Sequence, residues 1–255
     1  MQQLSRKLET NLKTLDGMFG TSADYYAKKI TIYHCKGCIV LFDGMASLDS
    51  LWALVLDGAS RQAPPQSRAG GPLTVEQVYT LVLQDSAFPA ESSPVEDLPD
   101  LVKRLTAGMA VLLLDGYAKG IAFSVQSLKA RSVEEPSGEG NLRGSREGFA
   151  DLLRVNLSLL RRLIRTDDLV QEVQQADTEA KTEYAVCYRR GRADPAMVAR
   201  VRKTLAAAKP ELLLDSSYFV PWLLPGKVRL FTPVSYTERP AAAAAKICEG
   251  KILVL

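Results

Sequence analysis

Apolar residues recur at helical spacing at the start of the chain. Leu4, Leu8, Leu12 and Leu15 lie four, four and three residues apart, which places them on one face of a helix. The polar residues between them interrupt the continuous apolar core that a secretory signal would need. The pattern therefore predicts an amphipathic opening helix.

In the first half of the chain, short apolar runs alternate with segments of helical periodicity. The runs are rich in β-branched and large residues and predict buried strands over 29–33, 38–42, 110–114 and 120–125. Apolar residues three or four positions apart predict short helices over 48–56, 74–83 and 95–105. The first half is therefore expected to be mixed α and β.

The clearest predicted element lies in the second half of the chain. A stripe of apolar side chains predicts a helix of about five turns, and its members are Phe149, Leu153, Leu157, Leu160 and Ile164. Further strands are predicted over 184–188, 228–231 and 251–255. A helix is predicted over 194–208, with Asp194 as its cap and Pro195 at its first position.

Three stretches rich in Pro, Gly, Ser and charge are expected to be connectors, namely 57–72, 86–100 and 132–145. The third divides the chain into a first lobe over 1–133 and a second lobe over 134–255. The last residues form an apolar strand, and an exposed apolar strand invites aggregation. This favours a piece of a longer protein.

Composition narrows the class of protein. Apolar residues make up 47% and charged residues 24% of the chain, which is typical of a globular protein with a real core. The net charge of +3 is far below the basic excess of a nucleic-acid-binding domain, so no nucleic-acid partner is expected. No run of about 18 apolar residues is present, so the chain as given is not expected to span a membrane. Four scattered cysteines favour a reducing compartment.

Two aspartates follow predicted strands and precede glycine. Asp43 and Asp115 stand where haloacid-dehalogenase-like phosphatases carry their nucleophile, but those enzymes need a second acid two residues on. Those positions hold Met45 and Tyr117. A tight turn, in which glycine supplies a positive φ angle, explains the pattern better.

His34, Cys35 and Cys38 have half the ligand spacing of a structural zinc site. Cys187 and Cys248 are isolated from each other, so free thiols are favoured over metal ligands. His34 is the only histidine, and no supporting catalytic spacing surrounds it. We expect no catalytic residue, no cofactor and no metal.

A group of arginines accompanies the predicted helix of the second half. The span contains only Glu147 and Asp151 as acids, and its basic members are Arg143, Arg146, Arg154, Arg161, Arg162 and Arg165. They could form a solvated basic helix face, attract anionic lipid headgroups, or pair with acidic groups of a partner. The last two possibilities fit a protein held at a membrane.

Two motifs in this half carry a resemblance to a known family. The first comprises Glu135-Pro136, Glu139, Arg143-Gly144-Ser145-Arg146-Glu147-Gly148-Phe149, Asn156 and Leu160-Arg161-Arg162. The second comprises Thr237-Glu238-Arg239-Pro240 and Glu249-Gly250-Lys251. In order and spacing the sequence resembles the GerA family of spore germinant receptor A subunits.

The resemblance implies a fold, a location and partners. The expected fold is two α/β lobes, each a small sheet flanked by helices, similar to the lobes of small-molecule-binding proteins. The chain would be the cytosolic portion of a nutrient receptor at the cytoplasmic face of the bacterial spore inner membrane, followed by a membrane domain that this sequence lacks. Receptor B and C subunits would be its partners, with a small-molecule nutrient and a second copy as further possibilities.

The matching residues are candidates for an interface that links the lobes through arginine–glutamate pairs. They are Glu135, Arg143, Arg146, Glu147, Asn156, Arg161, Arg162, Glu238 and Arg239. The expected role is non-enzymatic, in germinant sensing, signal transduction or receptor assembly. The alternatives are a purely structural oligomerisation scaffold or a phosphatase-like enzyme.

Overall fold

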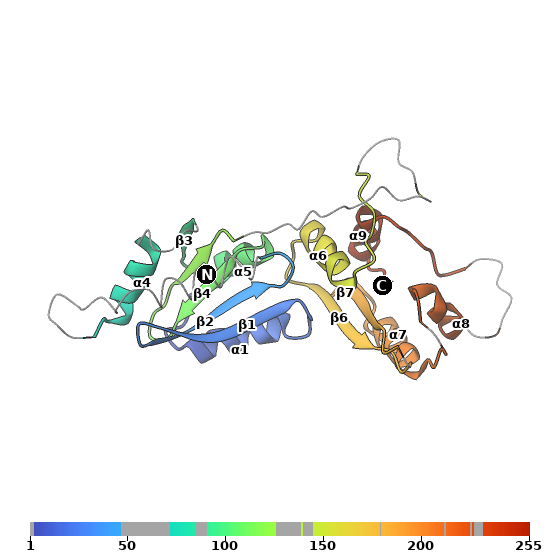
Figure 1. Cartoon of the computed structure of the whole chain (residues 1–255), viewed down its shortest axis with the longest axis horizontal. Helices are drawn as coiled ribbons and strands as arrows, with labels where there is room; N and C mark the ends of the chain where they lie inside the picture. Colours follow the sequence, from blue (N-terminus) through green and yellow to red (C-terminus); the bar gives the residue numbers. More distant parts are fainter. Residues whose placement is uncertain are drawn as a thin grey trace. The chain divides into compact units, whose positions relative to one another are not determined.

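A computed structural model describes residues 3–46, 72–84, 91–125, 139, 145–178, 180–211, 213–224, 226 and 232–255. The chain divides into two compact units (Figure 1). Unit 1 comprises Met1–Gly20 and Asp24–Lys129, and unit 2 comprises Thr21–Ala23 and Ala130–Leu255. The predicted boundary at 133–134, the predicted helix 48–56 and the predicted strand 228–231 lie outside the described residues.

The described part of unit 1 contains a five-stranded antiparallel sheet in the order β1-β2-β4-β5-β3. The strands are β1 (Tyr25–Ile32), β2 (Cys35–Phe42), β3 (Ser92–Val95), β4 (Ala110–Leu114) and β5 (Gly120–Phe123). The four strands predicted for this half are confirmed with small shifts of their ends. The connector predicted over 86–100 is wrong, because it contains β3 and the start of a helix. Pro94 is tolerated in β3 because this strand lies at the edge of the sheet.

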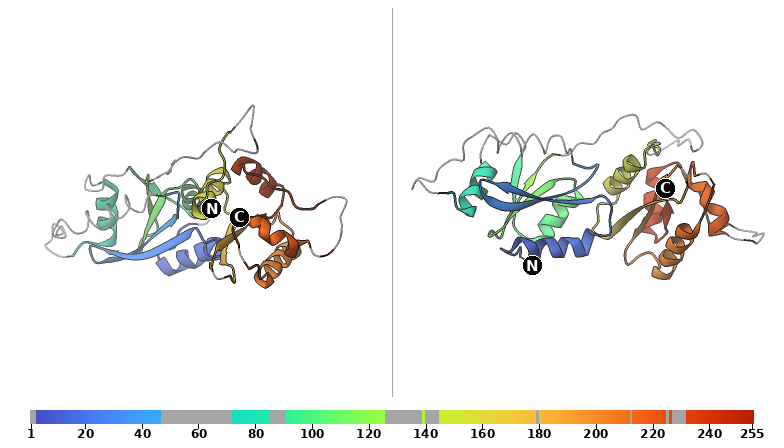
Figure 2. Two further views of the ribbon diagram at one scale, coloured as in Figure 1. Left: turned by 45° about the vertical axis from the view of Figure 1, so that its right-hand side comes forward. Right: turned by 60° about the horizontal axis from the view of Figure 1, so that its bottom comes forward.

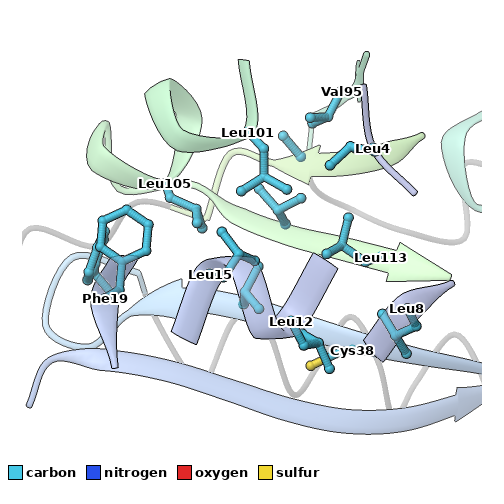
Figure 3. Close-up of a cluster of buried hydrophobic side chains, with 14 of the residues drawn as sticks. Leu4, Leu8, Leu12, Leu15, Phe19, Cys38, Val95, Leu101, Leu105 and Leu113 are labelled. Carbon is cyan, nitrogen blue, oxygen red and sulfur yellow. The ribbon is translucent and has the colours of Figure 1, made fainter. Parts of the chain in front are cut away.

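Helices cover both faces of this sheet (Figure 2). Along β2, Cys38, Val40 and Phe42 pack against α1 (Leu8–Phe19) and α5 (Leu98–Thr106), whereas Ile39 and Leu41 pack on the opposite face with α4 (Val75–Gln84). Figure 3 shows the α1 and α5 side, where the leucines predicted to form the opening helix enter the core. These helices confirm three predictions, although Leu4 precedes α1.

Unit 2 is built around a second antiparallel sheet in the order β6-β7-β8. The strands are β6 (Leu169–Gln175), β7 (Glu183–Arg189) and β8 (Leu253–Val254). On one face lie α7 (Pro195–Ala207), the 3-10 helix η2 (Ser216–Phe219) and α8 (Val220–Leu223), and on the other lie α6 (Leu153–Leu163) and α9 (Pro240–Cys248). The mixed α/β class, with sheets flanked by helices in two units, is thus as expected.

The long helix predicted from Phe149 onwards is shorter than expected, because α6 begins at Leu153. The side chain of Asn156 donates to the carbonyl of Ala150 and accepts from its N–H, both at 2.7 Å. These bonds hold the preceding chain outside the helix, while Phe149 still packs against the same core cluster as Leu157. Hydrophobic spacing therefore identified the buried face but not where the helix begins.

Candidate functional site

The first family motif surrounds the start of α6. Glu147 lies in the chain before the helix and forms an ion pair with the guanidinium of Arg162, which lies near the end of α6. Both side chains are largely shielded from solvent, at 24% exposure for Arg162 and 21% for Glu147. Together with the Asn156 bonds to Ala150, this pair fixes the extended segment along the helix.

The second motif meets the first within unit 2. The carboxylate of Glu139 accepts hydrogen bonds from the hydroxyl of Thr237 at 2.8 Å and from the backbone N–H of Glu238 at 3.3 Å. The N–H of Phe149 donates to the carbonyl of Glu238 at 2.8 Å. Arg239, which follows Glu238, directly precedes α9. The structure therefore brings the two motifs together although they are far apart in the sequence.

Arg161 is fully buried, so the solvated basic face, one of the three alternatives, does not hold for this residue. Its guanidinium donates to the Ser22 hydroxyl at 2.9 Å and to the carbonyls of Leu169 at 3.2 Å and Thr166 at 3.3 Å. A buried guanidinium is tolerated only where its donors are satisfied. The apolar stripe concealed this role, because Arg161 lies directly after Leu160.

The remaining basic residues of the group are placed differently. Arg146, Arg154 and Arg165 are exposed, and Arg165 donates to the carbonyl of Arg162 at 3.1 Å. Glu135 and Arg143 lie outside the described residues. The basic group therefore does not act as one surface, since buried, paired and exposed arginines are interleaved along α6.

Sequence reasoning missed a polar cluster on the other face of the unit 2 sheet. Glu172 of β6 pairs with Arg202 of α7, and the hydroxyl of Tyr188 of β7 donates to Glu172 at 2.8 Å. Burial, followed by the neighbouring Glu172 carboxylate, raises the pKa of Tyr188 to about 12. Three separate elements supply these residues, so no spacing in the sequence could reveal them.

A second missed pair joins the start of β6 to the end of β7. The guanidinium of Arg189 binds the Asp168 carboxylate through two nitrogens, with distances of 2.7 to 3.0 Å. Burial alone would raise the pKa of Asp168, but the hydrogen bonds from Arg189 hold this pKa below its ordinary value. The ion pair therefore joins the open end of the β6–β7 hairpin.

The two candidate nucleophiles are turn residues. Gly44 and Gly116 have φ angles of 78° and 91°, as expected for the turn interpretation. The Asp115 carboxylate accepts a hydrogen bond at 3.0 Å from the N–H of Leu8, the first residue of α1. It therefore caps a helix, which accounts for its position without any chemistry.

The cysteines next to His34 point to opposite faces of one strand. Tyr33 and His34 form the turn between β1 and β2, with φ angles of 46° and 73°. Cys35 packs on the α4 side of the sheet and Cys38 on the α1 side, so they cannot hold one metal ion between them. Burial raises the pKa of the Cys38 thiol to about 11. Within the described ranges, no three His, Cys, Asp or Glu side chains are grouped to hold a metal ion.

In the part of the chain that the structure describes, no helix has both the length and the apolar character needed to cross a bilayer.

These features define a protein of two α/β units, each with an antiparallel sheet between helices. The same fold occurs in the crystal structure of the N-terminal domain of the A subunit of the Bacillus megaterium spore germinant receptor GerK3, with a TM-score of 0.73. That likeness covers 100% of this chain and 92% of the other at 23% sequence identity. The family model described as Bacillus/Clostridium GerA spore germination protein matches residues 13–255. The chain therefore belongs to the GerA family, as its motifs indicated.

Relatives in Bacillus subtilis agree with this assignment. The uncharacterized membrane protein YfkQ is 35% identical over 147 residues, which cover 58% of this chain and 29% of YfkQ. Spore germination protein B1 is 27% identical over 255 residues, or 99% of this chain and 51% of the relative. Stage V sporulation protein AF is 26% identical over 250 residues, which cover 98% of this chain and 49% of that protein. This chain therefore spans about half the length of spore germination protein B1 and of stage V sporulation protein AF.

Proposed function

We propose that this chain is the signalling portion of a nutrient germinant receptor A subunit and that it helps to trigger spore germination. The observation that carries the proposal is the GerA family match over residues 13–255, together with the fold of a germinant receptor A-subunit domain over the whole chain. In this role the chain acts by ligand-dependent or partner-dependent rearrangement. It lies at the cytoplasmic face of the spore inner membrane and works with receptor B and C subunits, and a membrane domain outside this sequence anchors it.

The proposed role requires no chemistry from the chain itself. Asp115 caps α1, and the glycine after Asp43 has the backbone conformation of a turn. Phosphatase-like catalysis needs a nucleophile together with a general acid, and the second acid of that pattern is missing at Met45 and Tyr117. The helix-capping role of Asp115 thus supports a signalling function over the enzymatic alternative.

The motif residues are proposed to form the part of the chain that responds to partners or ligand. Their support is the meeting of Glu139 with Thr237 and Glu238, and the shielded Glu147–Arg162 pair. The proposed set is Glu135, Arg143, Arg146, Glu147, Asn156, Arg161, Arg162, Glu238 and Arg239. Glu139 and Phe149 bind the segment before α9, and Glu147 binds Arg162 of α6. A change at one motif is therefore proposed to alter the position of the other.

A thermal-shift screen of the purified chain against amino acids, sugars and nucleosides tests whether it senses nutrients directly. A ligand at about a hundred times its Kd stabilises a protein by roughly 2.7 kcal/mol, which raises the Tm of a chain of this size by several degrees. A reproducible shift with one nutrient class supports sensing within this chain. A flat screen with a working control protein would assign sensing to other parts of the receptor.

One observation favours a scaffold role as the second candidate. Large apolar side chains are exposed at four-residue spacing next to α7, with exposed fractions of 69% for Leu214, 38% for Tyr218 and 40% for Trp222. Aromatic residues of this kind are enriched at protein interfaces. If the chain is a scaffold, its mass in sedimentation rises with concentration and Trp222→Ala removes the rise, whereas a constant monomer mass contradicts this candidate.

A further inference from the structure

Unit 2 repeats the framework of unit 1, so equivalent positions of the two units can be compared. Each unit opens with a helix followed by an antiparallel hairpin, α1-β1-β2 in one and α6-β6-β7 in the other. The N–H of Asp43 donates to the carbonyl of Asp24 at 2.7 Å, and the N–H of Arg190 donates to the carbonyl of Asp168 at 2.7 Å. The hairpins are therefore closed by the same bond at the same place.

The two opening helices share an unusual side-chain bond. Asn11, the fourth residue of α1, accepts from the N–H and donates to the carbonyl of Ser5, six residues earlier. Asn156, the fourth residue of α6, makes both bonds to Ala150, again six residues earlier. This aligns α1 with α6 residue by residue and makes Arg161 the equivalent of Asp16.

The strand that follows each hairpin in the sheet also matches. β4 pairs antiparallel with β2, and β8 pairs antiparallel with β7. The helices that lead into them, α5 and α9, are each followed by a glycine with positive φ, 90° at Gly108 and 88° at Gly250. Val40 of β2 pairs with β4, and Cys187 of β7 pairs with β8 at the equivalent position. Their partners on the other side are Ala27 of β1 and Gln171 of β6, so Gln171 is the equivalent of Ala27.

At these two positions the units differ in burial. Asp16 and Ala27 are exposed in unit 1, whereas Arg161 and Gln171 are fully buried in unit 2. The cover in unit 2 is the segment Thr21–Ala23, here called the connector, which leaves α1 and leads into β1. A surface that is open in one copy of the framework is thus occupied in the other.

The connector is held by the two residues that distinguish unit 2. The Ser22 hydroxyl, 4% exposed, accepts hydrogen bonds from the Arg161 guanidinium at 2.9 Å and from the Gln171 N–H at 3.1 Å. The N–H of Ala23 donates to the carbonyl of Gln171 at 2.8 Å. The Gln171 side chain donates to the carbonyl of Leu157 in α6 at 2.9 Å, which fixes it between helix and connector.

We propose that Arg161 and Gln171 form a latch, and that this latch holds the connector of α1 and β1 as an added edge of the unit 2 sheet. The charged donor makes the bond to Ser22 stronger than a neutral one, and burial excludes competing water. A rearrangement of α6 would then move the connector, whose three residues are covalently continuous with α1 and β1. This transmission deepens the proposed signalling function and rests on it. The latch itself does not rest on that function.

Amide hydrogen exchange of the purified chain tests the latch. Ser22→Ala removes the hydroxyl that both Arg161 and Gln171 use, and we expect exchange at the Ala23 and Gln171 amides to accelerate by about tenfold or more. Arg161→Lys keeps the charge but loses the planar fork, and it should accelerate the same two amides. The amides of β7 should keep their parental rates in both variants.

Thr21→Val is the matched control in the same segment. It removes the bond from Arg190 to the Thr21 hydroxyl, which is exposed, so exchange at Ala23 should stay within about twofold of the parent. Parental exchange at Ala23 in Ser22→Ala would overturn the latch. So would an equal acceleration at β7, because Ser22 would then stabilise unit 2 as a whole.

The exchange result and the proposed function can fail separately. Spores that carry Ser22→Ala in the receptor should respond more weakly to nutrient if the latch serves signalling. Normal germination together with faster exchange at Ala23 would leave the latch intact and count against its signalling role.

Discussion

The Asp115 side chain makes a hydrogen bond to a residue that is close in space but distant in the sequence. Asp115 begins the turn after β4, yet its carboxylate caps the first turn of α1. The sequence predicted the turn at Gly116 from the residue types alone. The partner at Leu8 could not be predicted, because it depends on how α1 packs on the sheet.

Replacing Asp115 should destabilise unit 1 through α1. We expect Asp115→Ala to lower the free energy of unfolding by about 1 kcal/mol, since the N–H of Leu8 loses its acceptor and the helix dipole loses a nearby anion. Asp115→Asn keeps an acceptor and should lose less. Urea denaturation measures both variants, and equal stability of Asp115→Ala and the parent would contradict the capping role.

Asp168 should make the stability of the chain depend on pH. Arg189 lowers the pKa of this carboxyl in the folded state, so its ionised form stabilises the fold above the ordinary Asp pKa of about 3.9. That contribution disappears as the pH falls through the lowered, folded-state pKa. Asp168→Asn should therefore cost about 1 kcal/mol at neutral pH and progressively less in acid.

Asp167→Asn removes an exposed neighbouring charge and serves as the control. Thermal denaturation from pH 7 to pH 3 should show the parent and Asp168→Asn converging, with Asp167→Asn following the parent. A constant difference between the parent and Asp168→Asn over the whole range would contradict the linkage.

At the scale of elements, hydrophobic spacing predicted what is buried better than where elements begin. The helix over 195–207 agreed closely with its prediction because Asp194 and Pro195 mark its start chemically, and the Asp194 carboxylate accepts from the N–H of Ala196. No prediction was made for β6, whose C-terminal half is mostly polar, or for α9, whose run of alanines has no amphipathic period. Those elements are set by packing on β7.

The candidate site was predictable only as a set of motif residues. The resemblance identified Glu147 and Arg162, but their pairing depends on the extended chain running along α6. Tyr188, Glu172 and Arg202 carried no sequence signal, because each comes from a different element. The side-chain bond of Asn156 to Ala150 explains why the motif includes an asparagine inside a helix.

The shared asparagine bond predicts matched losses in the two units. Asn156→Ala and Asn11→Ala should each lower stability by about 1 to 2 kcal/mol, because each removes a donor and an acceptor from the preceding backbone. Asn156→Asp retains the acceptor for the Ala150 N–H and should lose less than Asn156→Ala. Chemical denaturation measures the losses, and a cost below about 0.5 kcal/mol in both alanine variants would contradict this account.

At the scale of the whole molecule, two copies of one framework differ in the elements and side chains added to them. In unit 1, α4, β3 and β5 extend the framework into a larger sheet covered on both faces. In unit 2, the framework carries the family motifs and the latch residues Arg161 and Gln171. The family match extends over residues 13–255 and the fold match over the whole chain, whereas signalling is the proposal that these matches support.

The most direct test of the central proposal is the nutrient response of spores in which the gene for this chain carries an in-frame deletion of residues 1–255. If the chain signals, these spores fail to germinate with at least one nutrient that triggers the parent, and the intact gene restores the response. Unchanged germination with every nutrient that triggers the parent would contradict a signalling role for this chain.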